Sequence, residues 1–281
     1  MREVPSKRIE EKIYALLLEA SYVISHDIEA AISAALVEEI SPAGREVLRQ
    51  ISENNLIAAE ERVAICQDTG MAIIFLEIGQ DVHIGGDSLE EAVNAAVRRA
   101  YLEGYLRKSV VRDPLYARVN TKDNTPAILH TRIVPGDQID ILVTPKGFGS
   151  ENMSAIRMLV PADGEEGVRK FVLETVEKAG PNPCPPIIVG IGIGGTMELA
   201  AIMAKRMTAR AIDQRHEDPR YAALEMSLLA DINKLGIGPG GIGGRTTALG
   251  VNIQTHPTHI AGMPVAINIC CHAARHAHGV I

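Results

Sequence analysis

The stretch IIVGIGIGGTMELAAIMAKRM, residues 187–207, contains both kinds of secondary structure that define the fold. Its first three residues are β-branched and apolar, which predicts a short buried strand. A glycine-rich run follows at 190–195, and MELAAIMAKRM at 197–207 has the composition of a helix. A strand that leads through glycines into a helix is typical of α/β proteins. We therefore predict a mixed α/β fold.

The glycine run itself satisfies the pattern GxGxxG, which dinucleotide-binding proteins place between a strand and a helix. That fold also needs a second strand ending in an acidic residue about 20 residues further on. Residues 206–226 instead read as helical and polar. Two interpretations stay open: a turn whose free N–H groups bind an anion such as a carboxylate, and a tight turn that only lets the helix pack on the sheet.

Residues before this stretch predict helices first and strands later. Ser6 is a suitable N-cap for a helix with apolar residues at a spacing of 3.6, and further helices fill the rest of residues 1–60, the third opening at Ser41-Pro42. Ala72 to Ile78 predicts a buried strand. Ser88 and Glu91 form a capping box for a helix that runs to about Arg107.

The remaining segments also alternate between strands and helices. Two strand-like runs between 127 and 143 flank Pro135-Gly136-Asp137, which predicts a β-hairpin. Helices are predicted over 168–179 and 219–235, and the last 45 residues alternate glycine-rich loops with short strands. We find no repeat or linker. The prediction is one domain, residues 1–281, with a helical subregion at 1–60 and a mixed-sheet catalytic region with a loop-borne site at 61–281.

Composition excludes several classes of function. Hydrophobic residues make up 46% and charged residues 22%, and the net charge of −7 argues against nucleic acid or an anionic membrane as a partner. The N-terminus is too charged for a secretory signal, and the longest apolar run, 187–195, is far shorter than the ~20 residues of a membrane span. We expect a cytoplasmic protein.

The chain has four cysteines, Cys66, Cys184, Cys270 and Cys271. Their spacing matches neither a zinc ribbon nor a ferredoxin motif, and a disulfide framework is not expected in a cytoplasmic chain of this length. They can be ordinary buried thiols. However, CQDTG, NPCPP and CCHAARH are turn-like or polar contexts, and three thiolates on three loops could hold a metal or a cluster.

Two other segments are dense in polar chemistry. KGFGSENMS, residues 146–154, combines a cation, glycines and helix-capping residues, which suits either an anion site at a helix start or a hairpin exit with a capped helix. The segment from Thr255 to His278 contains five of the nine histidines, two cysteines and Arg275. These residues alone indicate a soluble α/β enzyme with a thiolate-bound metal centre and a small anionic substrate.

CQDTGMAI, NTKDNTPA, KGFGSEN, GIGGT and PVAINICCHAARH, taken together and in this order, resemble the alpha subunit of class I iron–sulfur fumarate hydratases. That family includes L-tartrate dehydratases. The resemblance covers about three quarters of the chain or more. It departs from the family pattern at Phe148, which stands inside the glycine run of the KGGGS motif.

The resemblance implies a site with a 4Fe-4S cluster held by three cysteines. Its ligands would be Cys66, Cys184 and Cys271, with Cys270 as the alternative to Cys271; Cys271 follows His259 by twelve residues, as the family pattern has it. Asp68 would act in acid–base catalysis. Substrate contacts would come from Gln67, Asp68, Arg107, Gly149 and His259.

The resemblance further implies reversible hydration of fumarate to (S)-malate by a hydro-lyase. An iron that lacks a protein ligand would act as the Lewis acid, and the arginine would bind a carboxylate. A beta subunit, in an assembly of two alpha and two beta chains, would complete the site. The alternatives are an L(+)-tartrate dehydratase alpha subunit, a mesaconate-type hydratase, and a noncatalytic iron–sulfur or nucleotide-binding module.

Overall fold

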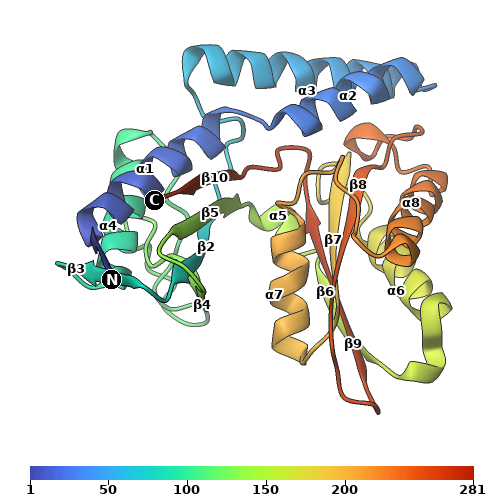
Figure 1. The fold of residues 1–281 in the computed structure, drawn as a ribbon. Helices are drawn as coiled ribbons and strands as arrows, with labels where there is room; N and C mark the ends of the chain where they lie inside the picture. Colours follow the sequence, from blue (N-terminus) through green and yellow to red (C-terminus); the bar gives the residue numbers. More distant parts are fainter. The chain divides into compact units, whose positions relative to one another are not determined.

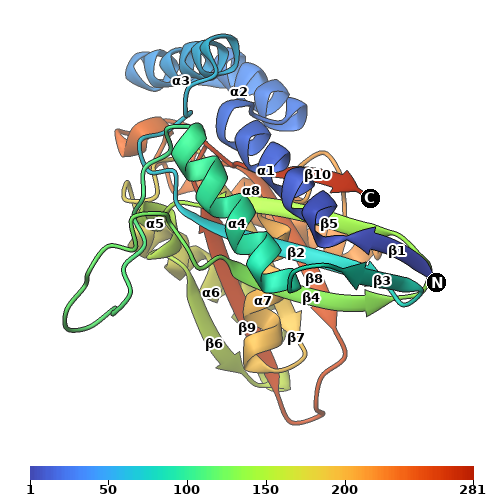
Figure 2. The same ribbon diagram turned by 90° about the vertical axis from the view of Figure 1, so that its left-hand side faces the viewer.

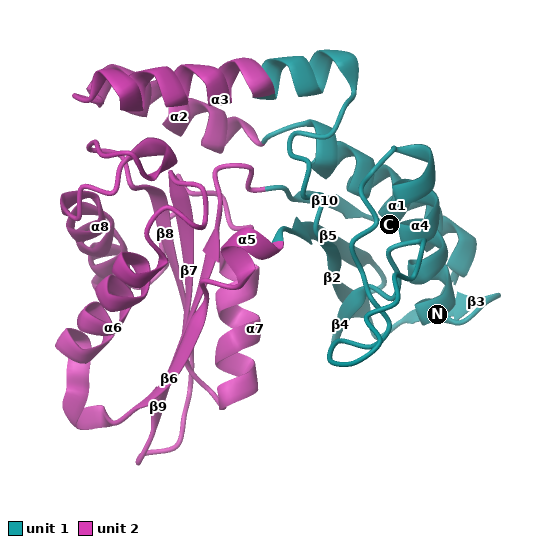
Figure 3. Cartoon of the chain, turned by 180° about the vertical axis from the view of Figure 1, so that it is seen from behind, with its two compact units in different colours: residues 1–24, 55–147, 275–281 teal, residues 25–54, 148–274 magenta.

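The computed structural model describes all residues, 1–281, and divides them into two compact units. Unit 1 comprises residues 1–24, 55–147 and 275–281, and unit 2 comprises residues 25–54 and 148–274 (Figure 3). The region 1–60 therefore contributes to both units. None of the helices combines the length and apolar composition that crossing a membrane requires. The single-domain organisation stays a prediction.

Unit 1 contains a four-stranded mixed sheet and a small two-stranded sheet. The strand order is β10-β5-β2-β4 in the first and β1-β3 in the second. The elements are β1 (Arg2–Pro5), α1 (Ser6–Tyr22), β2 (Met71–Gly79), β3 (Val82–Gly85), α4 (Leu89–Glu103), β4 (Ile128–Val134), β5 (Ile139–Lys146) and β10 (Ala277–Val280). Helix α3 (Pro42–Glu61) contributes residues to both units.

Helices α1 and α4 cover one face of the larger sheet in unit 1 (Figure 2). Apolar residues of α1 at the 3.6 spacing, such as Ile9, Ile13 and Leu17, are fully buried against alternate residues of β2. Helix α4 begins with Ser88 as its N-cap, as predicted: Ser88 Oγ accepts a hydrogen bond from Glu91 N at 3.2 Å and donates to a Glu91 carboxylate oxygen at 3.1 Å, so only one half of the capping box is formed. The helix ends at Glu103, four residues earlier than predicted, because Tyr105 adopts a left-handed conformation with φ 52°.

The predicted hairpin around residues 135–137 is wrong. β4 and β5 do not pair, since β2 lies between them and bonds to β4 in parallel and to β5 in antiparallel. The turn crosses the end of β2, where the N–H groups of Gly79 and Asp81 donate to carbonyls of the turn at 2.8 and 3.0 Å. β2 is apolar on both faces, so it is best buried as a central strand.

Unit 2 is a sheet of order β6-β9-β7-β8 with helices on both faces. Figure 1 shows α7 on one face and α6 and α8 on the other. The elements are α2 (His26–Glu38), α5 (Phe148–Glu151), β6 (Ala155–Leu159), α6 (Gly164–Ala179), β7 (Ile187–Gly194), α7 (Met197–Met207), α8 (Pro219–Lys234), β8 (Ala248–His256) and β9 (Met263–Cys270), with 3-10 turns at Pro161–Asp163 and Pro239–Gly241. The predicted mixed α/β class is confirmed.

The glycine run lies within a strand. β7 continues to Gly194, five residues beyond the predicted strand, and bonds to β8 and β9 on its two sides. A Cβ atom on Gly190 or Gly192 would lie 2.1 Å from a carbonyl oxygen of α7. These glycines therefore let the helix pack closely on the sheet, and the anion-binding interpretation is wrong for them.

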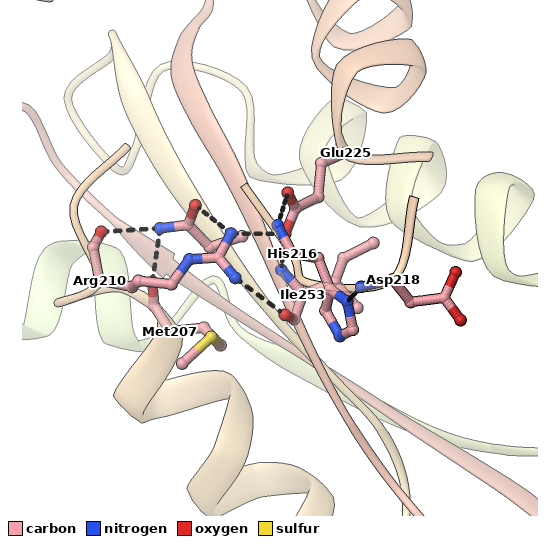
Figure 4. A network of polar contacts seen from close by, with 7 residues as sticks. Met207, Arg210, His216, Asp218, Glu225 and Ile253 are labelled. Atoms are coloured by element: carbon pink, nitrogen blue, oxygen red, sulfur yellow. Dashed lines mark hydrogen bonds and ion pairs between the residues drawn. The ribbon is translucent and has the colours of Figure 1, made fainter. Parts of the chain in front are cut away.

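A polar network joins the loop between α7 and α8 to strand β8 (Figure 4). The Arg210 guanidinium donates to a Glu225 carboxylate oxygen, to Asn252 Oδ1 at 2.8 Å and to the Ile253 carbonyl at 3.2 Å. The second Glu225 oxygen accepts from His216 N at 3.1 Å. Because Glu225 is fully buried, the loss of these partners would be costly to stability.

Glu39 is a second fully buried carboxylate of unit 2, just beyond the end of α2. It accepts hydrogen bonds of 2.8 to 3.0 Å from the backbone N–H groups of Ile40, Ser41, Arg245 and Thr246. Burial alone raises the pKa of Glu39, but the backbone donors together bring that pKa below its usual value. The charged form therefore stabilises the folded state.

Glu39→Gln is expected to lower the free energy of unfolding at neutral pH by about 2 kcal/mol, because several hydrogen bonds to a charged acceptor are weakened. A lowered pKa contributes stability that is present above the unfolded value of 4.5 and is lost as the pH falls through the lower folded value. The difference between the wild type and Glu39→Gln should therefore shrink below pH 4.5, as measured by urea unfolding. The exposed neighbour in Glu38→Gln is the control, and a difference that is independent of pH would contradict the interpretation.

Candidate active site

The loop CQDTG, residues 66–70, lies directly before β2 in unit 1. Cys66 and Asp68 are half-buried and Gln67 is exposed. Gly70 has a φ of +72°, and a Cβ atom there would lie 2.4 Å from the backbone of Lys146 at the end of β5. Only glycine fits this approach, so the loop is pressed against the end of the sheet.

Asp68 lies beside the guanidinium of Arg275, for which no role was predicted. Arg275 Nη1 donates to the Asp68 backbone oxygen at 2.6 Å, and Asp68 Oδ1 accepts from Gly70 N at 3.1 Å. A Cβ atom on Gly147 would lie 3.1 Å from Asp68 Oδ2 and 3.2 Å from Arg275 Nη2. Unit 1 therefore brings together a carboxylate, a buried guanidinium and the buried backbone of Gly147.

Two buried side chains hold the carbonyls of this loop. The Tyr101 hydroxyl lies 2.9 Å from the Thr69 oxygen and 3.0 Å from the Gly70 oxygen, and Asn124 Nδ2 donates to the Gly70 oxygen at 3.0 Å. Burial raises the pKa of Tyr101 far above its usual value. The nearby Arg275 guanidinium offsets part of this rise, and the Asp68 carboxylate adds to it. The phenol therefore keeps its proton at neutral pH and donates a hydrogen bond to the pair of carbonyl oxygens.

Arg107 is exposed and follows α4 in unit 1. Its carbonyl accepts a hydrogen bond of 2.9 Å from Thr69 Oγ1. This bond fixes the backbone of Arg107 next to the CQDTG loop. Unit 1 thus brings Gln67, Asp68 and Arg107, three of the predicted substrate contacts, into one neighbourhood.

Unit 2 contains the other three cysteines. Cys184 is exposed between two prolines, with a φ of 55°, and its N–H donates to the Pro181 carbonyl at 3.0 Å. Cys270 is the buried last residue of β9, where it pairs with Ile188, and Cys271 follows the strand and is half-buried. Because β7 begins just after the Cys184 loop, all three cysteines lie at the same end of the sheet.

Gly149 lies at this end of unit 2 as well. It is an exposed residue of the short helix α5, and a Cβ atom on it would lie 3.6 Å from the carbonyl oxygen of Asn182, two residues before Cys184. The side chain of the neighbouring Phe148 is also exposed. Unit 2 thus gathers one predicted substrate contact and the predicted cysteine ligands Cys184 and Cys271.

His259 lies at the opposite end of the same sheet. It is an exposed residue of the loop that joins β8 to β9, and its Nδ1 accepts from Ala261 N at 3.1 Å. Eight residues of β9 separate this loop from Cys271, a span of roughly 25 Å at the rise of an extended strand. Unit 2 therefore does not bring His259 together with its cysteines, and a substrate contact by His259 stays a prediction.

None of the four cysteines forms a disulfide bond. Cys66 belongs to unit 1, and Cys184, Cys270 and Cys271 belong to unit 2. Neither unit by itself groups three His, Cys, Asp or Glu side chains in an arrangement that could hold a metal ion. A ligand set of Cys66, Cys184 and Cys271 would take one thiolate from unit 1 and two from unit 2.

Comparisons with known proteins add to this geometry. The model of the family described as fumarate hydratase (fumerase) matches residues 10–280. A protein of Methanocaldococcus jannaschii, provisionally named L(+)-tartrate dehydratase subunit alpha, is 43% identical over 276 residues, which are 96% of this chain and 96% of that protein. The L(+)-tartrate dehydratase subunit alpha of Escherichia coli K12 is 33% identical over 241 residues, 84% of this chain and 78% of that protein.

The family match covers nearly the whole chain and includes each segment that carries the resemblance seen in the sequence. The relatives also extend over most of the chain at more than 30% identity. The chain therefore belongs to the class I fumarate hydratase family of hydro-lyases.

Proposed function

We propose that this chain is the alpha subunit of an iron–sulfur hydro-lyase that acts on a four-carbon dicarboxylate, with L(+)-tartrate as its main substrate. Two relatives that cover most of the chain are named as alpha subunits of L(+)-tartrate dehydratase. Their names favour L(+)-tartrate over fumarate, which the sequence alone put first. Fumarate and mesaconate remain the substrates to compare.

One observation carries the proposal: Asp68 is half-buried and adjoins the buried guanidinium of Arg275. A carboxylate in such a position can exchange a proton with a bound substrate. A nearby cation reduces the cost of placing a negatively charged substrate there. The site therefore combines an acid–base group with a surrounding that suits a dicarboxylate.

The cysteines suit an iron–sulfur cluster in their chemistry and exposure. Cys66, Cys184 and Cys271 would hold it, since all three lie on loops, outside any disulfide bond, and none is fully buried. Cys271 suits this role better than Cys270, which is buried within β9. When bound, an iron with an open position supplies Lewis-acid activation of a substrate oxygen.

The remaining steps belong to side chains of this chain. Gln67 and Arg107 bind and orient the substrate carboxylates, the arginine through its two-pronged guanidinium. In the dehydration direction Asp68 takes the proton from the carbon next to one carboxylate, and the hydroxyl on the neighbouring carbon leaves as water with a proton from the second acid–base group, which we assign to the beta subunit. With L(+)-tartrate this gives the enol of a keto diacid, which then tautomerises.

A partner chain completes the proposed enzyme. The relatives are named as alpha subunits, so we propose a beta subunit and an assembly of two alpha and two beta chains. The beta subunit would supply further cationic groups and the second acid–base group. On its own, this chain is expected to bind the cluster and to turn over poorly or not at all.

The test is anaerobic purification of the chain with and without its beta partner, with analysis of iron and sulfide, visible absorption and assays on L(+)-tartrate, fumarate and mesaconate. We expect a 4Fe-4S cluster, activity only in the assembled complex, the highest kcat/KM on L(+)-tartrate, and loss of activity in air. A complex that has a cluster but acts on none of these acids would favour a noncatalytic iron–sulfur module. Full activity of the isolated chain would refute the need for a partner.

A further inference from the structure

Glu151, the last residue of the short helix α5, is held from two directions within unit 2. One carboxylate oxygen forms an ion pair with Lys205 of α7, and the other accepts from Asn268 Nδ2 of β9 at 3.0 Å. The Lys205 side chain is 13% exposed and Asn268 is 5% exposed. The Glu151 side chain is 28% exposed, so the ion pair is only partly removed from water, and losing its partner is costly mainly for the more buried Lys205.

Ser154 ties the turn after α5 to the same strand. Its Oγ accepts hydrogen bonds from Asn268 Nδ2 at 3.0 Å and from Ile269 N at 3.1 Å. Asn268 and Ile269 immediately precede Cys270 and Cys271 in the chain. The turn from Glu151 to Ser154 is therefore bonded to the residues that determine where these cysteines lie.

The direction of the side chains along β9 strengthens this link. Ile267 and Ile269 belong to the apolar core of unit 2, so Asn268 and Cys270 point to the opposite face, which α7 covers. Lys205 reaches Glu151 from α7. The ionic and amide contacts of Glu151 thus lie on the face of the sheet toward which Cys270 points.

We propose that Glu151, Lys205 and Asn268 are positioning residues, which fix the helix carrying Gly149 relative to the end of β9 and Cys271. This inference rests on the proposed function, in which Gly149 contacts the substrate and Cys271 holds the cluster. The three side chains need not touch the substrate. They keep α5 and the cysteine pair from moving apart. This matters for catalysis because a small misplacement of the reacting groups lowers the reaction rate strongly.

The test uses Glu151→Gln, which keeps the shape of the side chain and removes its charge. In the cluster-loaded complex we expect KM to rise about 10-fold with a smaller change in kcat, because substrate placement is lost while Asp68 is retained. In the cluster-free full chain we expect alkylation of Cys270 and Cys271, followed by mass spectrometry, to become several-fold faster. Glu174→Gln is the control, because it removes an exposed ion pair with Arg157 in the same unit.

The charge-swapped double variant Glu151→Lys with Lys205→Glu should restore slow alkylation, since the ion pair is rebuilt and the Asn268 amide can turn to offer its oxygen. Ser154→Ala gives a milder form of the same defect and serves if Glu151→Gln does not fold. Wild-type alkylation rates and KM in both Glu151→Gln and Ser154→Ala would overturn the proposal. A wild-type complex with no hydro-lyase activity would refute the proposed function, whereas the alkylation rates would still decide whether these residues position the cysteines.

Discussion

Asp68→Asn is expected to lower kcat of the assembled enzyme by about 10²- to 10⁴-fold, the usual contribution of a general acid–base group. Asparagine keeps an oxygen that can accept from Gly70 N, a bond of 3.1 Å in the wild type. The loop should therefore retain its shape while losing the group that exchanges the proton. Steady-state rates on L(+)-tartrate under anaerobic conditions measure the effect.

The control for this variant is Asp87→Asn, which changes an exposed carboxylate of the same unit. Both variants should keep the iron content and the unfolding midpoint of the wild type, so that a loss of rate reports chemistry. If Asp68→Asn retained wild-type kcat with a full cluster, Asp68 would not be the acid–base group. The noncatalytic interpretation of the chain would then gain weight.

Gly192→Ala is expected to lower the free energy of unfolding by about 3 kcal/mol, at the upper end of what overpacking usually costs. A Cβ atom at this position would lie 2.1 Å from the Ala200 oxygen and 2.9 Å from the Ala204 nitrogen. These are backbone atoms of α7, so no side-chain rotation relieves the clash. The helix must move away from β7 or the strand must deform.

Gly262→Ala is the matched control in the same unit, because a Cβ atom there meets nothing within 4 Å. Urea unfolding should leave this control close to the wild type and shift only Gly192→Ala. An unchanged stability for Gly192→Ala would mean that α7 does not pack against β7 as closely as the structure has it. The explanation for the glycine run would then be wrong.

Local signals in the sequence predicted most of the elements. The Ser88 N-cap and the apolar run of β2 both appear where expected, since each depends on neighbouring residues alone. Strand pairing was harder. The segment Pro135-Gly136-Asp137 has the composition of a hairpin turn, yet β2, more than 50 residues earlier, separates the flanking strands. The partners of a strand depend on distant residues that a local pattern does not contain.

The candidate site was predicted in part for the same reason. CQDTG stood out because its reactive groups are adjacent in sequence. Arg275 was noted only as a neighbour of the cysteines, because its contact with Asp68 joins residues 207 positions apart. The twelve-residue spacing between His259 and Cys271 served only to choose the third cysteine ligand, and it gave no sign that an extended strand separates the two residues. Motif spacing identifies the residue types of a site better than it identifies their distances.

The sheet of unit 1 is built from segments that are distant in the chain. β10 pairs with β5, and Arg275, just before β10, contacts the backbone of Asp68. During synthesis on the ribosome, Arg275 emerges only after residues 148–274 of unit 2 have been made. A nascent chain that has translated Asp68 and all of β5 therefore still lacks this guanidinium, so the acid–base loop acquires its final contacts late in translation.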